Sequence, residues 1–196
     1  MEQQKFRNAL QEESTYPATE NIYNYIISAG KRITLKKNDV LIGYDEINAD
    51  IYFILDGIIR GTIINGDGIE RTVGFGLCGT MIYSAQCYSV GNPSIYQFQA
   101  CCDTVVLRIK KTEFDRHIAE DHEFCKWVLG SFSLTICYKE LRNEGLNGDA
   151  LFKYKWLKEK RPEIINLVSD KIIASYLNIT EVHLSRIKSK ILKEKS

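Results

Sequence analysis

The stretch Asp170–Ser189, DKIIASYLNITEVHLSRIKS, has the spacing of two short helices joined by a tight turn. Its apolar residues fall where the inner faces of two such helices would meet: Ile173, Leu177, Ile179, Leu184 and Ile187. The fifth position holds Ala174, whose small side chain would let the second helix cross the first at a steep angle. The spacing therefore predicts a helix-turn-helix.

The predicted turn lies at Asn178. A turn of this kind needs a positive φ, which glycine adopts most readily and asparagine next. Thr180 follows and offers an N-cap oxygen to the second helix. Within that helix, Leu184, Ile187 and Ile191 are spaced i, i+3 and i+7, so we expect them to form one buried stripe.

The side chains off this stripe are polar and basic, as reading the major groove of DNA requires. The candidate DNA contacts are Thr180, Glu181, His183, Ser185, Arg186, Lys188 and Lys190. A helical hairpin with a solvated basic face would carry the same charges. The complete spacing pattern favours DNA binding.

The C-terminal segment resembles the helix-turn-helix of the Crp/Fnr family of bacterial transcription factors, above all in the run ASYLNITEVHLSRIKSKI. The resemblance implies that Ser169 and Lys171 contact DNA phosphates and that RNA polymerase is a partner. Many members read a cytosine with a glutamate directly after the position of Glu181, where this chain has Val182. The family's operator sequence is therefore not expected here, although its arginine is retained as Arg186.

The chain has 196 residues, enough for two domains, and its 44% hydrophobic and 26% charged residues are ordinary for a globular protein. No apolar run approaches the roughly 20 residues that a membrane span needs. The first residues, MEQQKFRNALQEES, lack the apolar core of a signal peptide. We therefore expect a cytoplasmic protein.

The net charge of +1 hides an asymmetry along the chain. Residues 151–196 carry 11 Lys and Arg against 5 Asp and Glu, a net charge of +6, which leaves −5 for residues 1–150. A basic segment on an acidic body is typical of a protein that binds a polyanion at one end.

Six cysteines raise the question of a metal or redox site: Cys78, Cys87, Cys101, Cys102, Cys125 and Cys137. They include no C-x2-C pair, and the adjacent Cys101 and Cys102 would point to opposite faces of a strand. Iron–sulfur members of the family use a cysteine cluster near the N-terminus, which this chain lacks. We expect reduced, half-buried thiols and no metal or other cofactor.

The rest of the chain predicts an α+β protein. Residues 1–30 look helical with a break at Pro17, and from Lys31 short β-branched and aromatic runs alternate with turn signals, as in a jelly roll. The run Val40–Gly61 resembles the opening of the cyclic-nucleotide-binding jelly roll. The predicted domains are an effector-binding jelly roll with N-terminal helices (1–110), connecting and dimerisation helices (111–146) and a helix-turn-helix DNA-binding domain (147–196).

After Lys110 the pattern becomes helical, with Thr112 as a candidate cap of a short helix and Asp121 as the cap of a long one reaching about Arg142. The long helix has two apolar faces, and a helix in a monomer usually needs only one. The predicted dimer interface is a coiled-coil seam of Phe124, Trp127, Ser131, Leu134, Tyr138 and Leu141. The second stripe is Cys125, Leu129, Phe132 and Ile136. Burial of the helix in a single large core is the alternative.

The resemblance implies a small effector in the jelly roll. Cyclic-nucleotide members bind the ribose through a glycine–glutamate pair, which aligns with Tyr83 and Ser84, and the phosphate through an arginine, which aligns with Ser94. No Arg or Lys occurs between Arg71 and Arg108, so a buried phosphate would lack a counter-charge and we expect no cyclic nucleotide to bind. The candidate pocket for a different effector is Tyr83, Ser84, Tyr88, Ser94 and Tyr96, which ordinary strand packing explains equally well.

Two functions from different classes follow from the sequence. The first is a homodimeric, sequence-specific transcription regulator of the Crp/Fnr type, which responds to an unidentified small effector other than cAMP. The second is a jelly roll that binds a small ligand or a protein partner and whose basic helical tail does not read DNA. An enzyme is not expected, because the β-rich part contains no histidine and no catalytic arrangement of Ser, His, Cys and Asp has supporting context.

Overall fold

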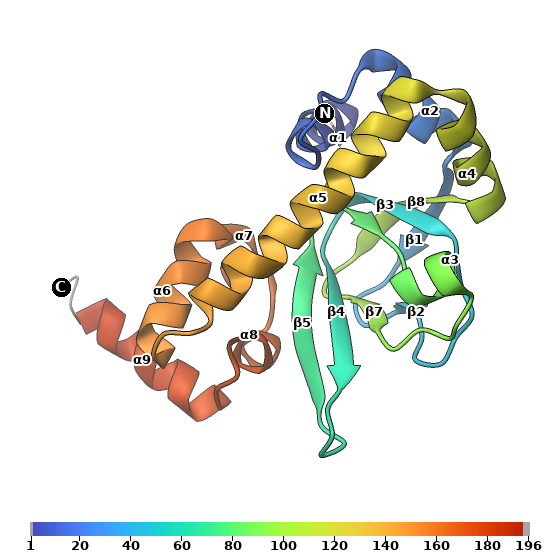
Figure 1. The fold of residues 1–196 in the computed structure, drawn as a ribbon. Helices are drawn as coiled ribbons and strands as arrows, with labels where there is room; N and C mark the ends of the chain where they lie inside the picture. Colours follow the sequence, from blue (N-terminus) through green and yellow to red (C-terminus); the bar gives the residue numbers. More distant parts are fainter. Residues whose placement is uncertain (1, 194–196) are drawn as a thin grey trace.

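The structure is a computed structural model that describes residues 2–193. The outermost residues of the first and third predicted domains, residue 1 and residues 194–196, lie outside this range. A jelly roll occupies one end of the molecule and a group of four helices the other, and the long helix α5 (His122–Gly145) runs alongside both (Figure 1). The predicted order of jelly roll, long helix and helix-turn-helix is confirmed.

The jelly roll consists of two four-stranded antiparallel sheets. In the first sheet the strand order is β1 (Lys31–Leu35), β8 (Thr104–Ile109), β3 (Ile51–Asp56) and β6 (Met81–Ile82). In the second it is β2 (Val40–Ile42), β7 (Gln97–Ala100), β4 (Ile59–Ile64) and β5 (Glu70–Gly76). Strand β5 lies at the edge of the second sheet, next to the C-terminal helices.

Aliphatic and aromatic side chains fill the space between the two sheets. This core consists of Leu35, Ile42, Tyr52, Ile54, Ile59, Ile82, Ala100 and Val106. Strand β3 turns Tyr52 and Ile54 to this core, and its other face, with Ile51, Phe53 and Leu55, is buried outside it.

The N-terminal helices α1 (Glu2–Glu12) and α2 (Glu20–Ala29) cover the outside of the first sheet. Pro17 lies in the segment between them, as predicted. Phe6, Leu10, Ile22 and Ile26 are fully buried in a second core, which also contains side chains of β3, β8 and the first half of α5. One face of the first half of α5 is thus buried within a single protomer.

Two short elements were not predicted: strand β6 and helix α3 (Ala85–Val90). Two residues of β6 and six of α3 are too few for a periodic pattern to stand out in the sequence. The Ser84 hydroxyl accepts a hydrogen bond from the Cys87 amide and so caps α3, and Gly91 ends the helix with a φ of 71°.

The long helix starts where the sequence predicted. The Asp121 carboxylate accepts a hydrogen bond of 2.9 Å from the Phe124 amide. The short helix α4 (Lys111–Glu120) begins one residue before Thr112, so the prediction that Thr112 caps it was wrong. Helix α5 passes close to the α1–α2 connection at Gly130, where a Cβ atom would lie 2.3 Å from Ser14 Oγ.

The C-terminal group consists of α6 (Ala150–Lys160), α7 (Pro162–Leu167), α8 (Asp170–Leu177) and α9 (Glu181–Lys193). Pro162 occupies the first turn of α7, where its missing N–H costs nothing. Gly145 ends α5 and lies against the ring of Trp156 in α6, which a Cβ atom would approach to 2.3 Å. The junction between α5 and α6 is therefore a packed contact.

Candidate nucleic-acid interface

Asn178 forms the turn between α8 and α9 in the left-handed conformation, with φ 55° and ψ 48°. The amide of Ile179 closes the end of α8 by donating a hydrogen bond of 3.0 Å to the Ala174 carbonyl. The predicted requirement for a positive φ at this position is therefore confirmed.

Helix α9 begins with the predicted cap, because Thr180 Oγ1 accepts a hydrogen bond of 3.2 Å from the His183 amide. Leu184, Ile187 and Ile191 form a buried stripe on the inner side of the helix. Together with Ala174 and Tyr154 they belong to the core of the C-terminal domain. This packing fixes the rotation of α9 about its own axis and hence decides which side chains point outward.

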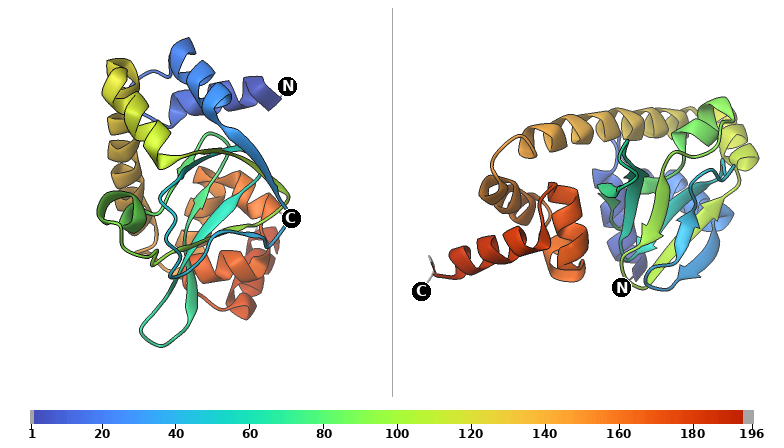
Figure 2. Two further views of the ribbon diagram at one scale, coloured as in Figure 1. Left: turned by 90° about the vertical axis from the view of Figure 1, so that its right-hand side faces the viewer. Right: turned by 90° about the horizontal axis from the view of Figure 1, so that it is seen from below.

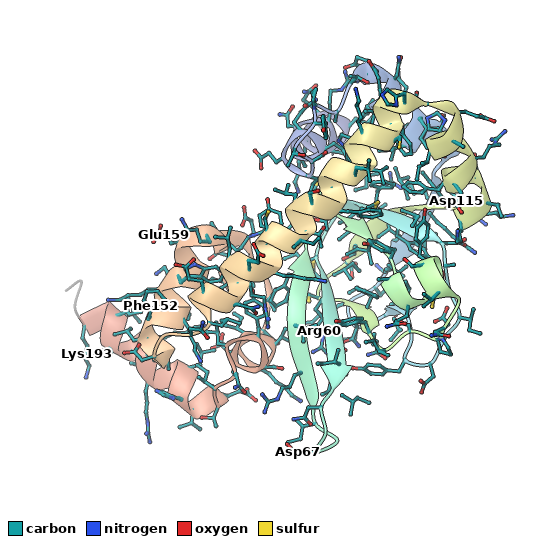
Figure 3. All side chains as sticks on the ribbon, viewed as in Figure 1. Arg60, Asp67, Asp115, Phe152, Glu159 and Lys193 are labelled. Atoms are coloured by element: carbon teal, nitrogen blue, oxygen red, sulfur yellow. The ribbon has the colours of Figure 1, made fainter. Side chains whose placement is uncertain are left out.

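The outward face of α9 lies opposite that stripe. Val182, Arg186, Ser189 and Lys193 follow each other at i, i+4, i+7 and i+11, and all four are exposed. A shallow surface hollow on this side is lined by Ser185, Arg186, Ser189, Lys190 and Lys193. The helix projects away from the jelly roll (Figure 2), and Lys193 lies at the outer edge of the molecule (Figure 3).

Most of the predicted DNA contacts are exposed side chains of the helix pair. These are Ser169, Lys171, Thr180, Glu181, His183, Ser185, Arg186 and Lys190. Ser169 is the N-cap residue of α8, but its hydroxyl makes no capping hydrogen bond. The structure brings Ser185, Arg186 and Lys190 together around one hollow.

Lys188 does not belong to the outward face, which corrects its prediction as a DNA contact. Its ammonium group forms an ion pair with Asp170 at the start of α8, and the side chain is half-buried. Its other neighbours line a separate hollow on the flank of α9, formed by Tyr154, Lys158, Lys188, Ile191 and Leu192. The charge of Lys188 therefore serves the contact between α8 and α9.

Three residues of the outward face were absent from the prediction: Val182, Ser189 and Lys193. The signal that could have found them is the helical repeat counted outward from Arg186, since residues at i−4, i+3 and i+7 share its face. The prediction had instead selected polar residues that were off the apolar stripe, wherever they lay around the helix.

The helix-turn-helix is docked on edge strand β5 of its own jelly roll. Arg71 Nη1 donates a hydrogen bond of 2.7 Å to Asn178 Oδ1, and the Thr72 amide donates one of 3.0 Å to Ser175 Oγ. Next to them the rings of Phe75 and Tyr176 lie 5.0 Å apart. These contacts satisfy an edge-strand amide and fix α8 relative to the jelly roll.

The predicted dimer seam on α5 is wrong in its first half. Phe124, Trp127 and Ser131 are buried within the protomer, against α1, α2 and the first sheet, so they are not available to a second subunit. Leu134 is half-buried, while Tyr138 and Leu141 are exposed. The guanidinium of Arg161 lies over the Tyr138 ring at 5.1 Å, so this side of α5 faces the C-terminal helices.

The second apolar stripe of α5 is also largely exposed. Leu129 and Ile136 are exposed, and Phe132 between them is half-buried against Tyr83 at a ring distance of 5.5 Å. These three residues are spaced i, i+3 and i+7 and lie on one face of the helix.

Two of the five predicted pocket residues have structural roles. Ser84 is buried and caps α3. Ser94 is buried in a turn, where its hydroxyl donates to the Tyr96 carbonyl at 2.7 Å and its amide donates to the Glu46 carbonyl at 2.9 Å. Both hydroxyls are engaged within the fold, so the prediction that they line an effector pocket was wrong.

The three predicted pocket tyrosines are divided between two places. Tyr83 and Tyr88 meet edge to face at 5.9 Å beside α4 and α5, whereas Tyr96 packs on Phe98 of β7. The Tyr88 hydroxyl donates to Asp115 Oδ1 at 2.5 Å, and burial together with this carboxylate raises the pKa of Tyr88. Lys111 lies over the Tyr88 ring at 4.4 Å, but it pairs with Asp115. Asp115 is labelled on α4 in Figure 3.

None of the six cysteines, from buried Cys87 and Cys101 to exposed Cys137, forms a disulfide. Burial raises the pKa of Cys101 to about 12, so its thiolate, the reactive form, is scarce at neutral pH. Within residues 2–193 no three His, Cys, Asp or Glu side chains are grouped closely enough to hold a metal ion. In the same part of the chain no helix is long and apolar enough to cross a membrane.

Comparisons with known proteins agree with this architecture. Residues 32–121 match the protein family described as cyclic nucleotide-binding domain. FixK2 from Bradyrhizobium japonicum has a similar structure, with a TM-score of 0.70 at 18% identity over 85% of this chain and 86% of FixK2. CLP of Xanthomonas campestris, described as a c-di-GMP-responsive global regulator, has a TM-score of 0.70 at 11% identity over 88% of this chain and 91% of CLP.

CprK, solved in complex with OCPA, gives a TM-score of 0.63 at 18% identity over 90% of this chain and 84% of CprK. No curated protein matches the sequence significantly. The fold that the sequence predicted is therefore confirmed. Residues 32–121 thus match a cyclic nucleotide-binding domain, and the long helix α5 and the helix-turn-helix follow it, in the fold that FixK2, CLP and CprK share.

Proposed function

We propose that this protein is a dimeric transcription regulator of the Crp/Fnr type that reads DNA sequence through α9. The observation that carries the proposal is the exposed face of α9, where Arg186, Ser189 and Lys193 lie opposite the buried stripe. A helix that shows polar and basic side chains to solvent from its first turns, and that projects from the end of the molecule, can enter the major groove.

Each cation of this region would have a distinct role. Arg186 lies in the second turn of α9, where its guanidinium can bond O6 and N7 of a guanine. Lys190 and Lys193 flank the same hollow farther along the helix and would bind phosphates, as would Ser169 and Lys171 at the start of α8. The net charge of +6 on residues 151–196 supports contact with a polyanion.

Dimerisation would use the exposed stripe of α5. Leu129, Phe132 and Ile136 lie on the side of α5 away from the buried residues Phe124 and Trp127, and no other part of the protomer covers Leu129 or Ile136 among the described residues. Exposed leucine and isoleucine on one helix face favour pairing with the same helix of a second copy. The domain boundaries near residues 110 and 146 coincide with the two ends of this connecting region.

The jelly roll would sense a small effector other than a cyclic nucleotide. No Arg or Lys occurs between Arg71 and Arg108, and the hydroxyls of Ser84 and Ser94 form hydrogen bonds within the fold. A buried phosphate would therefore lack a partner. Two proteins with this fold are described with different small molecules, c-di-GMP for CLP and OCPA for CprK, so the fold by itself does not decide the class of effector. RNA polymerase remains a partner expected from the resemblance alone.

Selection of bound sites from a random pool of duplex DNA tests the proposed function. We expect the full-length protein to enrich a motif with two-fold symmetry whose half-sites lie about one helical turn, roughly 10 base pairs, apart. A jelly roll whose basic tail binds polyanions or a protein partner would retain DNA in low salt without enriching any sequence. That outcome would contradict the proposal.

A further inference from the structure

Val182 is an apolar side chain at the centre of an otherwise polar surface. It is 62% exposed in the first turn of α9, on the face that also presents Arg186 and Ser189. The other strongly exposed apolar residue of α9, Leu192, is 68% exposed and lies on the flank of the helix beside Lys158. Of these two, only Val182 has the position of a residue that would enter the groove with Arg186.

The chemistry of a valine restricts what it can recognise in DNA. It neither donates nor accepts a hydrogen bond, so it cannot distinguish the polar groups that guanine, adenine and cytosine present in the major groove. Thymine alone adds an apolar group there, its C5 methyl. An exposed valine on a helix that enters the groove is therefore suited to thymine.

The spacing to Arg186 locates this base. Val182 and Arg186 are one turn apart on the same face, so their Cβ atoms are about 5–6 Å from each other. Successive base pairs are about 3.4 Å apart along the DNA axis. The two side chains would therefore meet base pairs that are adjacent or separated by one.

We propose that Val182 is a specificity-determining residue that recognises a thymine, through its C5 methyl group, one or two base pairs from the guanine contacted by Arg186. The inference rests on the proposed function, because it assumes that α9 enters the major groove. It deepens that function by naming a base that the operator of this protein should contain.

The test replaces each thymine of the selected half-site, one at a time, with deoxyuridine, which removes only the C5 methyl group. For the wild-type protein we expect one position at which the replacement weakens binding about fourfold per half-site, the effect of losing contact with one methyl group. Val182→Ser should abolish this sensitivity. Leu192→Ser is the matched control, and it should retain the wild-type sensitivity because Leu192 lies off the reading face.

Two results would overturn the inference while leaving the proposed function intact. One is a wild-type protein that binds all deoxyuridine duplexes as tightly as the parent duplex. The other is a Val182→Ser protein with the same sensitive thymine as the wild type. Failure to select any motif would instead contradict the proposed function, and with it this inference, at the first step of the experiment.

Discussion

Asn178 combines a turn conformation with a contact between domains. Its φ of 55° is one that side chains with a Cβ atom rarely adopt, and its side-chain oxygen accepts the hydrogen bond from Arg71 of β5. The sequence indicated the first property, since the spacing requires a turn at this residue. It did not indicate the second, because Arg71 lies more than 100 residues earlier in the chain.

A pair of substitutions separates these two roles. Asn178→Gly and Asn178→Ala both remove the hydrogen bond to Arg71, but only alanine keeps a Cβ atom at a positive φ. We expect Asn178→Ala to have the lower free energy of unfolding, by about 1 kcal/mol relative to Asn178→Gly. Urea denaturation of the two variants measures the difference, and an alanine variant as stable as the glycine variant would show that the turn is not strained.

Residue identity alone also failed to separate the basic side chains of α9. Lys188 and Lys190 both looked like DNA contacts in the sequence, but Lys188 pairs with Asp170 whereas Lys190 borders the outward hollow. The two differ by 200° around the helix, an angle that follows from the helical repeat once the buried stripe is known. Charge indicated a segment suited to a polyanion, and only the rotation of α9 tells which of its charges face outward.

At the level of elements, α5 shows that sequence periodicity predicts a helix and its apolar faces but not which face is buried within the protomer. The sequence predicted the start of the helix at Asp121 and the presence of two apolar faces, and both are observed. It placed Phe124 and Trp127 in a dimer seam, because helices α1 and α2, which cover these two residues, are remote in the sequence. The helix-turn-helix was predicted more accurately because most of the contacts that define it lie within 20 residues.

A charge placed on either face of α5 should affect dimerisation differently. Ile136 and Leu141 are 59% and 53% exposed, but they are about 140° apart around the helix. We expect Ile136→Asp to give a monomer, because it would bury two unpaired charges between the paired helices. Leu141→Asp, which introduces the same charge on the other face, should remain a dimer.

Light scattering at micromolar protein concentration checks both variants against the wild type. A monomeric Leu141→Asp together with a dimeric Ile136→Asp would instead assign the dimer contact to the exposed end of the predicted seam, Tyr138 and Leu141. A wild-type protein that is itself monomeric would contradict dimerisation through either face.

At the scale of the whole molecule, the C-terminal helices are attached to the jelly roll in two ways. Helix α5 leads into them through Gly145 and Trp156, and strand β5 holds α8 through Thr72, Arg71 and Phe75. A ligand that altered the packing of β5 or α5 would therefore change the position of α9. The sequence predicted the order of the domains correctly but contained no signal for the contact with β5.

Cyclic nucleotides should not be that ligand. We expect that neither cAMP nor cGMP at millimolar concentration raises the melting temperature, because a ligand stabilises the native state only if it binds to it. The physical reason is the missing cation opposite the phosphate, since Ser94 stands where the family has arginine and its hydroxyl is used in a turn. A saturable upward shift in thermal denaturation would refute this expectation.

The central claim is that α9 reads base sequence through Arg186, and binding affinities measured for two duplexes test it most directly. The wild type, Arg186→Ala and Lys158→Ala would each be titrated with the selected duplex and with a scrambled duplex of equal length. Lys158→Ala removes the same charge from the flank of α9 and should leave the ratio of the two affinities unchanged. For Arg186→Ala we predict a loss of about 1–3 kcal/mol per half-site on the selected duplex alone, so that the ratio collapses. An Arg186→Ala protein with the wild-type ratio would contradict the account.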